Sequence, residues 1–331
     1  MKILVTGGCG FIGTNFILYI LKKYKDYKII NLDKLTYAGN PENLKAIEND
    51  PRYKFIKGDI CDKELVNKLM QEVDAVIHFA AESHVDRSIL NADEFIKTNV
   101  LGTKVLLDAA LNNNKKRFHH ISTDEVYGSI KEGKFRETTL YNPKSPYAAS
   151  KAEADQLVKS YYKTYGLPIT ISNCSNNYGP YQFPEKLIPL FVTNLIEGKK
   201  LPIYGQGTNV RDWIHVDDHN EAVDLIFHKG KIGETYCIGG NCELKNLEIT
   251  KLILEEFNLE EDQIEFVKDR KGHDFRYAID FTKINKELGW SPKHNFEEGL
   301  KTTIQWYKEN EEWWKPLKSK VIPNITRKQN G

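Results

Sequence analysis

A glycine-rich turn near the start of the chain constrains its fold more than any other feature. The apolar stretch Lys2–Thr6 predicts a short buried strand, and Phe11–Lys23 predicts an apolar-rich helix. Between them lies Gly7-Gly-Cys-Gly10-Phe-Ile-Gly13. Glycines placed here permit a tight turn, a close approach of the backbone to a pyrophosphate, and close contact between helix and strand. The turn therefore predicts a strand–turn–helix unit that binds a dinucleotide, with the phosphates at the start of the helix.

Strands and helices alternate through the first half of the chain. After the first unit we expect strands at 28–32, 53–57, 75–79, 117–122 and 168–174, and helices at 62–72, 92–112 and 145–165. Apolar strands separated by helices predict a parallel sheet covered on both faces, because each crossover places a helix against the sheet. Right-handed crossovers then give an α/β fold of the Rossmann, doubly wound type.

The length of the chain and a change in its sequence pattern predict two structural regions. At roughly 100–200 residues per domain, a chain of 331 residues suggests about two domains. Past residue 177 the expected elements are shorter, and a loop rich in Pro and aromatic residues follows. We expect a dinucleotide-binding domain at 1–177, to which segments near 210–240 return, a smaller α/β substrate-binding region at 178–317, and a tail at 318–331.

Composition disfavours several classes of protein. Lys and Arg number 47 and Asp and Glu 46, so the net charge of +1 attracts neither nucleic acid nor an anionic membrane. No apolar run approaches the roughly 20 residues of a membrane span, and the start of the chain lacks the form of a signal peptide. We therefore expect a cytoplasmic protein. The five cysteines include no C-x-x-C pair, and the nine histidines show no metal-ligand spacing, so we expect reduced thiols and no metal site.

The residues after the next two strands favour NAD as the cofactor. Asp33 follows the second strand, about 20 residues past the last glycine of the turn. A carboxylate in this position accepts hydrogen bonds from the ribose 2′-OH and repels a 2′-phosphate, although the neighbouring Lys34 adds a positive charge. Asp59-Ile60 follows the third strand and is placed to meet the adenine end of the cofactor. The small residues of Phe79-Ala-Ala-Glu-Ser83 would let a flat cofactor lie against the backbone.

A second group of residues supplies acid–base chemistry. Asp124 and Glu125 follow the strand at 117–122, and Tyr147 and Lys151 lie one helical turn apart. A phenol with a pKa of about 10 is a poor base at neutral pH, so positive charge from Lys151 and from an oxidised nicotinamide is expected to lower that pKa. Two adjacent carboxyl groups push their pKa values apart, so that one can be protonated while the other is ionised. Hydride transfer alone does not require such a pair.

These residues occur in the order typical of the extended short-chain dehydrogenase/reductase family, which the chain resembles from Met1 to about Leu317. More specifically, the chain resembles the sugar-nucleotide 4,6-dehydratases of that family. This finer resemblance rests on the stretches 80–88, 122–128, 174–182, 185–189, 210–213 and 272–280. Two positions depart from the family pattern, because Cys9 and Asn173 stand where Ala and Arg are expected.

The resemblance implies an NAD-dependent dehydration, with dTDP-glucose as the expected substrate and a 4-keto-6-deoxy sugar nucleotide as the product. Tyr147 would take the proton of the sugar 4-OH while the C4 hydride passes to NAD⁺, with Lys151 supporting the phenol. Glu125 would then remove the C5 proton, Asp124 would protonate the departing 6-OH, and the hydride would return to C6. Thr123 would hydrogen-bond to the 4-OH.

The resemblance also implies binding residues for each ligand. For NAD these are Gly7, Gly10, Phe11, Ile12, Gly13, Asp33, Lys34, Leu35, Thr36, Asp59, Ile60, Phe79, Ala80, Ala81, Ser83, Thr98, Tyr147, Lys151 and Asn177. For the sugar nucleotide they are Ser83, His84, Thr123, Asn176, Glu185, Lys186, Leu187, Pro202, Ile203, Tyr204, Arg211, Asn246, Arg270, His273 and Tyr277. Lys186, Arg211 and Arg270 are the cations expected to neutralise the diphosphate.

Three alternatives stay open at this point. A UDP-glucose 4,6-dehydratase would differ in substrate by one methyl group, and a methyl-sized difference in a pocket is worth only about 1–3 kcal/mol. A sugar-nucleotide 4-epimerase is disfavoured by Asp124 and Glu125, because such enzymes tend to carry small or apolar residues there. A binding protein without activity would be expected to lack Tyr147, Lys151 or the carboxylates. The family also implies a homodimer, and the predicted helices at 92–112 and 148–165 are long enough for a four-helix contact.

Overall fold

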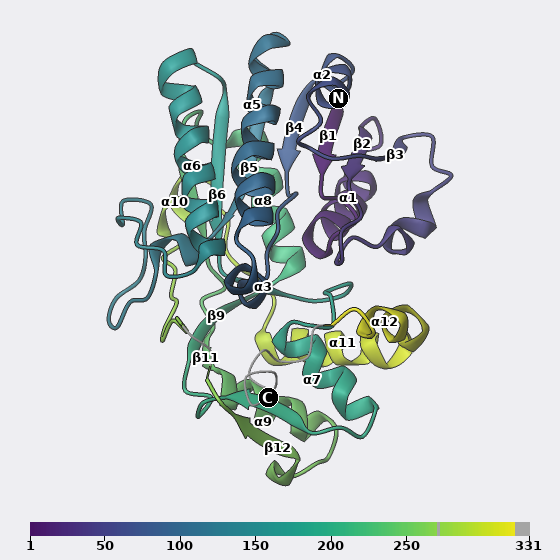
Figure 1. Ribbon diagram of the computed structural model, residues 1–331, viewed down its shortest axis with the longest axis vertical. Coiled ribbons are helices and arrows are strands. Elements are labelled where there is room, and N and C mark those ends of the chain that lie inside the picture. Colours follow the sequence, from purple (N-terminus) through teal and green to yellow (C-terminus); the bar gives the residue numbers. More distant parts are fainter. Residues whose placement is uncertain (270–271, 322–331) are drawn as a thin grey trace.

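Seven parallel strands form the central sheet of the computed structural model, which describes residues 1–269 and 272–321 (Figure 1). The strands are β1 (Lys2–Thr6), β2 (Lys28–Asp33), β3 (Tyr53–Lys57), β4 (Ala75–His78), β5 (Arg117–Thr123), β6 (Ile169–Cys174) and β10 (Thr235–Ile238). Their order across the sheet is β10-β6-β5-β4-β1-β2-β3, with every pair parallel. The predicted doubly wound α/β fold is confirmed.

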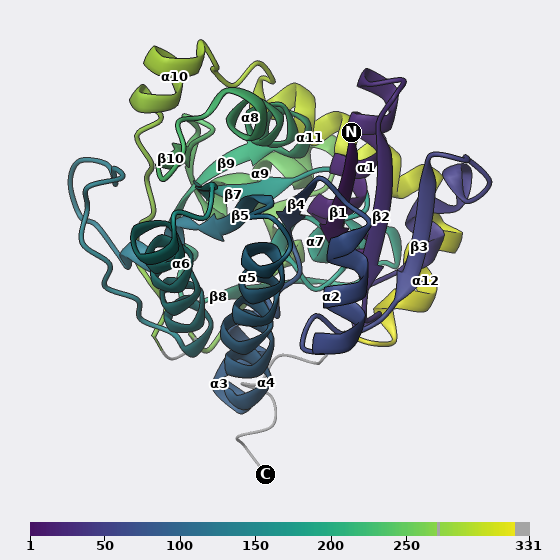
Figure 2. The same cartoon turned by 90° about the horizontal axis from the view of Figure 1, so that it is seen from above.

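Helices cover both faces of this sheet (Figure 2). The helices on one face are α2 (Lys63–Gln71), α5 (Thr103–Asn112) and α6 (Pro146–Tyr165), and those on the other are α1 (Phe11–Lys23), α8 (Val216–Lys229) and α10 (Thr282–Leu288). Alternate residues of β1 serve the two faces: Ile3 and Val5 pack with α1 and α8, whereas Leu4 packs with α2, α5 and α6. Both sets are apolar because both faces of a covered parallel sheet are buried.

Local capping fixes where the helix that bears Tyr147 and Lys151 begins. The Ser145 hydroxyl accepts a hydrogen bond from the N–H of Ala148, and Pro146 occupies the first helical position, where no N–H is needed. The helix ends at Gly166, whose φ of +66° is the left-handed conformation common after helices. The cap therefore sets Tyr147 in the first turn of α6, where that turn meets the carboxyl end of the sheet.

The stretch 92–112 differs from the single α-helix predicted for it. It contains a short α4 (Asp93–Phe95), a π-helix labelled η2 (Ile96–Gly102), and α5. Asn99 of the π segment is buried and binds the segment after β4, since its amide accepts from the N–H of Glu82 (2.9 Å) and donates to the Glu82 carbonyl (3.0 Å). Its Nδ2 also reaches the Ser150 hydroxyl on α6 at 2.8 Å. The π segment thus holds in place a loop that lines the candidate site.

The second part of the molecule lies beyond the carboxyl edge of the large sheet, in the lower half of Figure 1. Its strands form the sheets β11-β9-β7 and β12-β8, and its core gathers Trp213, Phe191 and Trp314. Its strands are β7 (Asn176–Tyr178), β8 (Leu201–Tyr204), β9 (Val210–His215), β11 (Glu243–Lys245) and β12 (Ile264–Val267), and its helices are α7 (Leu187–Ile196), α9 (Asn246–Glu256), η4 (Glu261–Gln263), α11 (Phe296–Glu309) and α12 (Glu311–Lys318). The remaining short helices are η1 (Pro41–Ile47), α3 (Val85–Leu90) and η3 (Asp124–Tyr127). Within the described residues, no helix is both long and apolar enough to cross a membrane.

Candidate active site

The glycine turn forms a cradle that only small residues fit. Gly7 has a φ of +72°, and a Cβ there would lie 2.6 Å from the backbone of Ala80. A Cβ on Gly13 would lie 2.4 Å from the Gly7 carbonyl oxygen. Gly10 stands at the N-cap of α1 and provides no side-chain cap for the first N–H groups of this helix. The first turn of α1 therefore suits an anion such as a pyrophosphate.

Asp33 lies at the carboxyl end of β2 and holds this cradle from the side. Its carboxylate accepts hydrogen bonds from the N–H groups of Cys9 (2.9 Å) and Leu35 (2.8 Å). Burial raises the pKa of Asp33, and the two N–H groups oppose that shift. The neighbouring Lys34 forms an ion pair with Asp59 at 2.9 Å, so part of its positive charge is already compensated. The preference for a ribose hydroxyl over a 2′-phosphate is thereby strengthened.

A cavity of about 310 Å³ runs from the glycine turn to the carboxyl ends of β5 and β6. Predicted NAD residues in its lining are Gly7, Gly10, Phe11, Ile12, Gly13, Asp33, Lys34, Thr36, Asp59, Ile60, Phe79, Ala80, Ala81, Ser83, Thr98, Tyr147, Lys151 and Asn177. The cavity is also lined by Thr123, Asp124 and Glu125. Leu35 is the predicted NAD residue that does not line it; with a φ of +57°, Leu35 contributes its backbone N–H to Asp33 instead.

Asp124 and Glu125 are adjacent in the chain but differ in their surroundings. Both follow β5 in the short helix η3, where the Thr123 hydroxyl accepts from the N–H of Glu125 and lies 3.3 Å from Asp124 Oδ1. Asp124 is only 2% exposed, whereas Glu125 is half-buried and lines two cavities. Burial, followed by the charges of Glu125 and Asp212, raises the pKa of Asp124 well above its usual range. The surroundings of Asp124 therefore favour its protonated form, in contrast to those of an exposed carboxylate.

Tyr147 lines the same cavity, but the protein alone does not make it a base. Burial and then the charge of Glu125 raise the pKa of its phenol, and Thr123 lowers it by a smaller amount. The pKa decrease expected from the sequence included the charge of an oxidised nicotinamide; the protein groups alone raise the pKa, because the phenol shares a low-dielectric site with carboxyl groups. Lys151 donates to the Ile121 carbonyl at 2.7 Å, and burial lowers its pKa to about 8. A further positive charge near the phenol would oppose the rise in its pKa.

A buried polar network lies behind Lys151. Its ammonium nitrogen is 3.4 Å from His120 Nε2, which is in turn 3.3 Å from Asp155 Oδ1. The other carboxylate oxygen of Asp155 accepts from the hydroxyls of Ser122 (2.9 Å) and Tyr141 (2.8 Å). Burial opposes the ionised form of Asp155, but His120 and Lys151 hold its pKa below the usual value. The Asp155 charge in turn raises the pKa of Lys151 against the effect of burial.

Asn173 and Cys9, the two residues that depart from the family pattern, are both buried, and the structure shows their contacts. Asn173 donates through Nδ2 to Asp155 Oδ2 and to the Thr123 carbonyl, both at 3.2 Å. An uncharged amide thus satisfies Asp155 where a guanidinium was expected, and the Asp155 charge acts on His120 and Lys151 instead. The Cys9 side chain is fully buried under the glycine turn, and burial raises the pKa of its thiol to about 12.

A second cavity of about 210 Å³ adjoins the first, and Glu125, Asn176, Glu185 and Lys186 line both. Predicted substrate residues in its lining are His84, Asn176, Glu185, Lys186, Leu187, Pro202, Ile203, Tyr204, Arg211, Asn246, His273 and Tyr277. Ser83 and Thr123 line the first cavity, and Arg270 lies outside the described residues. Glu125 thus stands where the two cavities meet, and Asp124 lies beside it in the first.

Charged side chains of both signs line this second cavity. Arg87 approaches Glu185 Oε2 at 3.2 Å, and Lys186 donates to the Ser83 carbonyl at 3.0 Å. Arg211 is 5% exposed, donates to the carbonyl of Asp274 at 3.0 Å, and lies 4.1 Å from the centre of the Tyr277 ring. Cations held in a cleft by neutral carbonyls and aromatic faces retain charge for a phosphate group.

Comparison with known proteins agrees with this geometry. The GDP-mannose 4,6 dehydratase family matches residues 4–303, which is most of the chain. The chain is 50% identical over 323 residues to a dTDP-glucose 4,6-dehydratase of Streptomyces niveus, with 96% of each chain covered. It is 52% identical over 322 residues to a dTDP-glucose 4,6-dehydratase of Mycobacterium tuberculosis, again with 96% of each chain covered.

The chain belongs to the GDP-mannose 4,6 dehydratase family.

The similar solved structures include both dehydratases and epimerases. A dTDP-glucose 4,6-dehydratase of Streptomyces venezuelae, with NAD and TYD bound, superposes with a TM-score of 0.94 at 51% identity, covering 96% of this chain and all of that one. A UDP-glucose 4-epimerase of Thermotoga maritima, with UDP-glucose, gives a TM-score of 0.87 at 30% identity, covering 94% of this chain and all of that one. The fold is shared by both, whereas the sequence is much closer to the dehydratase.

Several residues of the dehydratase site were not selected from the sequence. Arg87 lies over the Tyr37 ring at 3.6 Å and pairs with Glu185. Ser175 and Gln182 line the first cavity, and each has a buried side-chain oxygen without a hydrogen-bond partner among the described residues. Arg87 falls inside the family-like stretch 80–88, so that stretch was the signal that could have found it. Gln182 likewise ends the stretch 174–182.

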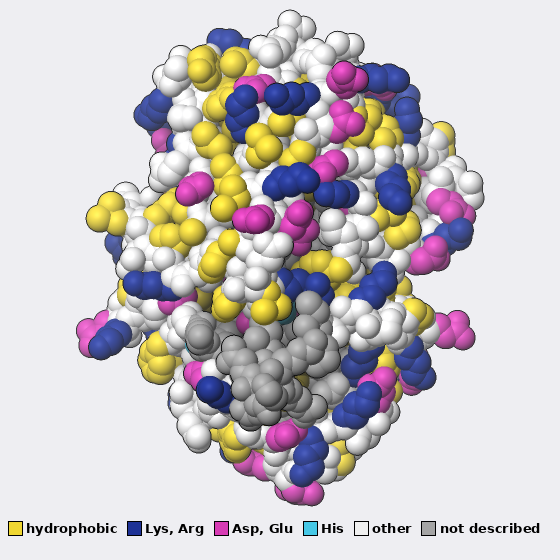
Figure 3. All heavy atoms as spheres, in the orientation of Figure 1, with side chains coloured by type: hydrophobic (Ala, Val, Ile, Leu, Met, Phe, Trp, Pro, Cys, Tyr) yellow, Lys and Arg dark blue, Asp and Glu magenta, His cyan; other side chains and the backbone are white. Residues whose placement is uncertain are grey.

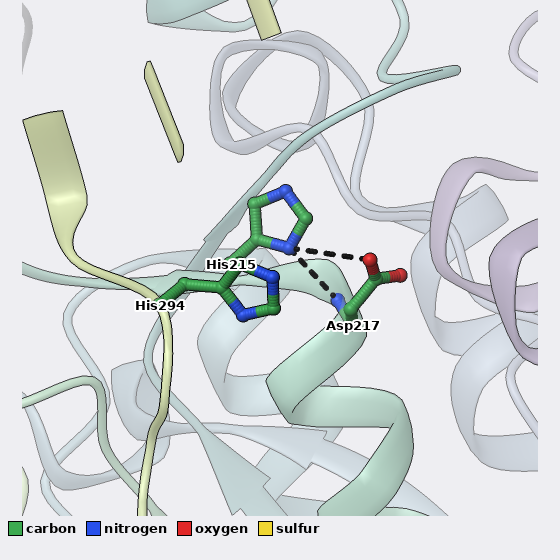
Figure 4. Close-up of side chains that lie close together, drawn as sticks. All are labelled: His215, Asp217 and His294. Carbon is green, nitrogen blue, oxygen red and sulfur yellow. Dashed lines mark hydrogen bonds and ion pairs between the residues drawn. The ribbon is translucent and has the colours of Figure 1, made fainter. Parts of the chain in front are cut away.

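Two histidines and a carboxylate also come together outside both cavities, at the start of α8 (Figure 4). His215 caps this helix by accepting from the N–H of Asp217 at 3.3 Å, and its ring stacks on His294 with centroids 4.2 Å apart. The lone pair of His215 Nδ1 is thus used by the cap. His294 Nδ1 contacts Asp218 at 2.8 Å. This geometry favours helix capping over metal binding.

Proposed function

We propose that the chain is a dTDP-glucose 4,6-dehydratase that uses NAD to form dTDP-4-keto-6-deoxyglucose. The observation that carries the proposal is the unlike pair Asp124 and Glu125. Asp124 is buried and its pKa is raised, whereas Glu125 is half-buried at the junction of two cavities. Elimination of water needs an acid and a base at the same moment, and this pair offers both. The full-length relatives of about 50% identity carry the same activity in their names.

The first cavity fits NAD. Its glycine turn has room for a pyrophosphate, Asp33 is placed for a ribose, and Lys151 is placed beside Tyr147. Bound NAD⁺ would supply the redox chemistry, accepting a hydride from C4 of the sugar and returning it to C6. Its positive charge would also lower the pKa of Tyr147, which the protein groups alone raise.

The chain's own residues then move protons in a defined order. Tyr147 takes the proton of the 4-OH as C4 is oxidised, and the resulting ketone makes the C5–H acidic. Glu125 removes the C5 proton, Asp124 gives its proton to the 6-OH, and the C6–O bond breaks to release water. Glu125 returns a proton to C5 when C6 is reduced. Thr123, which contacts Asp124, is placed to bind the 4-OH.

The second cavity suits the nucleoside diphosphate of the substrate. Lys186 and Arg211 line it, and we add Arg87 as a third described cation. The relatives named above act on dTDP-glucose, which supports a thymine over a uracil base. A sugar-nucleotide 4-epimerase has no evident need for a protonated Asp124. We assign residues 1–177, with the returning segments near 210–240, to the cofactor and 178–317 to the sugar nucleotide.

We also propose that the enzyme is a homodimer through η2, α5 and α6. Ile96 and Leu101 are 53% and 47% exposed although both are apolar, and Tyr165 at the end of α6 is 48% exposed. Figure 3 shows apolar side chains among the charged ones on the upper face, over these helices. Exposed apolar side chains on adjacent helices suit a helix-to-helix contact with a second copy.

The test of the catalytic assignment is a pair of isosteric variants, Asp124→Asn and Glu125→Gln. Each should retain C4 oxidation, seen as accumulation of reduced cofactor by absorbance, and should lose about 10²–10⁴-fold in the rate of water loss. Tyr147→Phe is the matched control, because it should prevent formation of reduced cofactor altogether. Product formation by both carboxylate variants at the wild-type rate would remove the role assigned to the pair.

A further inference from the structure

A directed chain of hydrogen bonds joins α12, near the end of the chain, to the glycine turn. The indole N–H of Trp313 donates to Asn43 Oδ1 at 2.7 Å, across 270 residues of sequence. Asn43 Nδ2 donates to the Thr14 hydroxyl at 3.2 Å, and this hydroxyl donates to the carbonyl of Gly8 at 3.0 Å. Every donor in this series of hydrogen bonds points toward the glycine turn, so the bonds polarise one another in the same direction.

The chemistry of the groups permits only this direction. An indole N–H is a donor and a carbonyl is an acceptor, so the Asn43 oxygen must face Trp313 and its nitrogen must face the Cys9 carbonyl, 3.1 Å away. The Cys9 carbonyl and the indole N–H require the same orientation of the amide, so loss of the indole would leave the Asn43 oxygen mismatched with its surroundings, without a donor. Asn43 is 4% exposed, so little water is available to correct such a mismatch.

The same peptides are held from their other side. The N–H of Gly8 donates to Asn31 Oδ1 at 3.1 Å, and the N–H of Cys9 donates to Asp33 at 2.9 Å. The Cys9 carbonyl also accepts from the N–H of Asn40 at 2.9 Å. Glycine-rich backbone has many accessible conformations, so its geometry depends on such ties. Asn43 supplies two of the ties through its amide nitrogen, and Trp313 holds the amide from the other side through its oxygen.

Aromatic packing fixes the position of the indole. Trp313 contacts Trp306 and Tyr181 with ring centroids 5.0 Å and 5.9 Å apart. A second tie runs in parallel, because Asn15 of α1 donates to the carbonyl of Pro180 at 3.0 Å. The C-terminal helices of the substrate half are therefore fastened to the helix and turn that would hold the pyrophosphate.

We propose that Trp313 and Asn43 are positioning residues for NAD: the indole orients the Asn43 amide, and the amide fixes the glycine turn in the conformation that accepts the pyrophosphate. Neither side chain lines the cofactor cavity, so both act through the turn. This inference rests on the proposed use of NAD by the first cavity.

The test measures NAD⁺ affinity by calorimetry on the full chain freed of nucleotide. Trp313→Phe keeps the aromatic packing but removes the donor, and Asn43→Ala removes both ties. Each should raise the Kd for NAD⁺ by about three- to tenfold, the effect expected from a lost hydrogen bond, while the KM for the sugar nucleotide stays unchanged. The double variant should match Asn43→Ala, since the indole acts only through the amide.

Trp306→Phe is the matched control. Trp306 belongs to the same aromatic cluster, but among the described contacts it makes no hydrogen bond to the glycine turn. It should leave the Kd unchanged. An unchanged Kd in Trp313→Phe, an equal rise in Trp306→Phe, or additive effects in the double variant would overturn the inference. Absence of NAD⁺ binding by the wild-type chain would instead overturn the proposed function, so the two failures are distinguishable. Trp313→Phe preserves the test if Asn43→Ala does not fold.

Discussion

At the scale of single residues, the site depends on carboxyl groups whose surroundings differ. Burial and nearby charges raise the pKa of Asp124, whereas His120, Lys151 and a Tyr141 hydroxyl hold the pKa of the equally buried Asp155 below its usual value. The same residue type thus supplies an acid at one point and a fixed negative charge at another. Burial alone raises the pKa of a carboxyl group, so the partners decide which form persists.

Asp155 should control the pH range over which Lys151 stays protonated. In Asp155→Asn the negative charge that raises the Lys151 pKa is lost, so the alkaline limb of the C4-oxidation rate should move to lower pH. The groups that face Lys151 are His120 from β5, Cys174 from β6 and Asp155 from its own helix, with His78 of β4 beyond His120. The measurement is the pH profile of reduced-cofactor formation.

Tyr141→Phe is the control for this experiment, because it removes a donor to Asp155 and leaves the charge in place. Its alkaline limb should remain where the wild-type limb lies. A role of Asp155 in packing alone predicts a lower rate at every pH with no displacement of the limb, and that result would contradict the electrostatic account.

At the scale of elements, the sequence pattern predicted those strands and helices whose first and last residues are set by nearby residues in the chain. The helix Phe11–Lys23 and the strands Lys2–Thr6 and Tyr53–Lys57 have the predicted bounds. The π segment η2 was not predicted, because one extra residue per turn alters the phase of the apolar pattern without a distinct composition. The bond between Trp313 and Asn43 was also out of reach, since spacing along the chain carries no information about contacts between distant segments.

The helices proposed for the dimer give a prediction at this scale. Ile96→Asp combined with Leu101→Asp should convert the dimer to a monomer, because unpaired charge buried in an apolar contact is costly. Phe266→Asp is the control, since Phe266 is 53% exposed on β12, in the second part of the molecule, and should leave the mass unchanged. Sedimentation equilibrium measures the outcome. A monomeric wild-type chain, or a dimeric double variant, would show that these helices do not form the contact.

At the scale of the whole molecule, stability should fall as the pH is lowered. Burial lowers the pKa of His120 to about 4 and of His219 to about 3, and holds those of His78 and His119 well below their usual value. The unfolded chain binds protons at these histidines near pH 6.5 whereas the folded chain does not, so the stabilisation is present above that pH and is lost below it. Between about pH 6.5 and 5 each such histidine costs ~2 kcal/mol.

Thermal unfolding followed by circular dichroism at a series of pH values measures this effect. The expected result is a Tm that is nearly constant just above about pH 6.5 and falls steeply below it. His219→Gln should make the Tm fall less steeply as the pH is lowered, because it removes one of the buried histidine rings. A Tm that is constant down to about pH 5 would contradict the neutral state assigned to these histidines.

The central claim is that the whole molecule performs an internal redox elimination on a dTDP sugar. The most direct test incubates the purified chain with dTDP-glucose deuterated at C4, with UDP-glucose in parallel, and follows the products by mass spectrometry and proton NMR. The account predicts a product from dTDP-glucose that is lighter by one water and carries the deuterium at C6, with slower conversion of UDP-glucose. A product of unchanged mass with the deuterium still at C4, as a 4-epimerase would form, would contradict it.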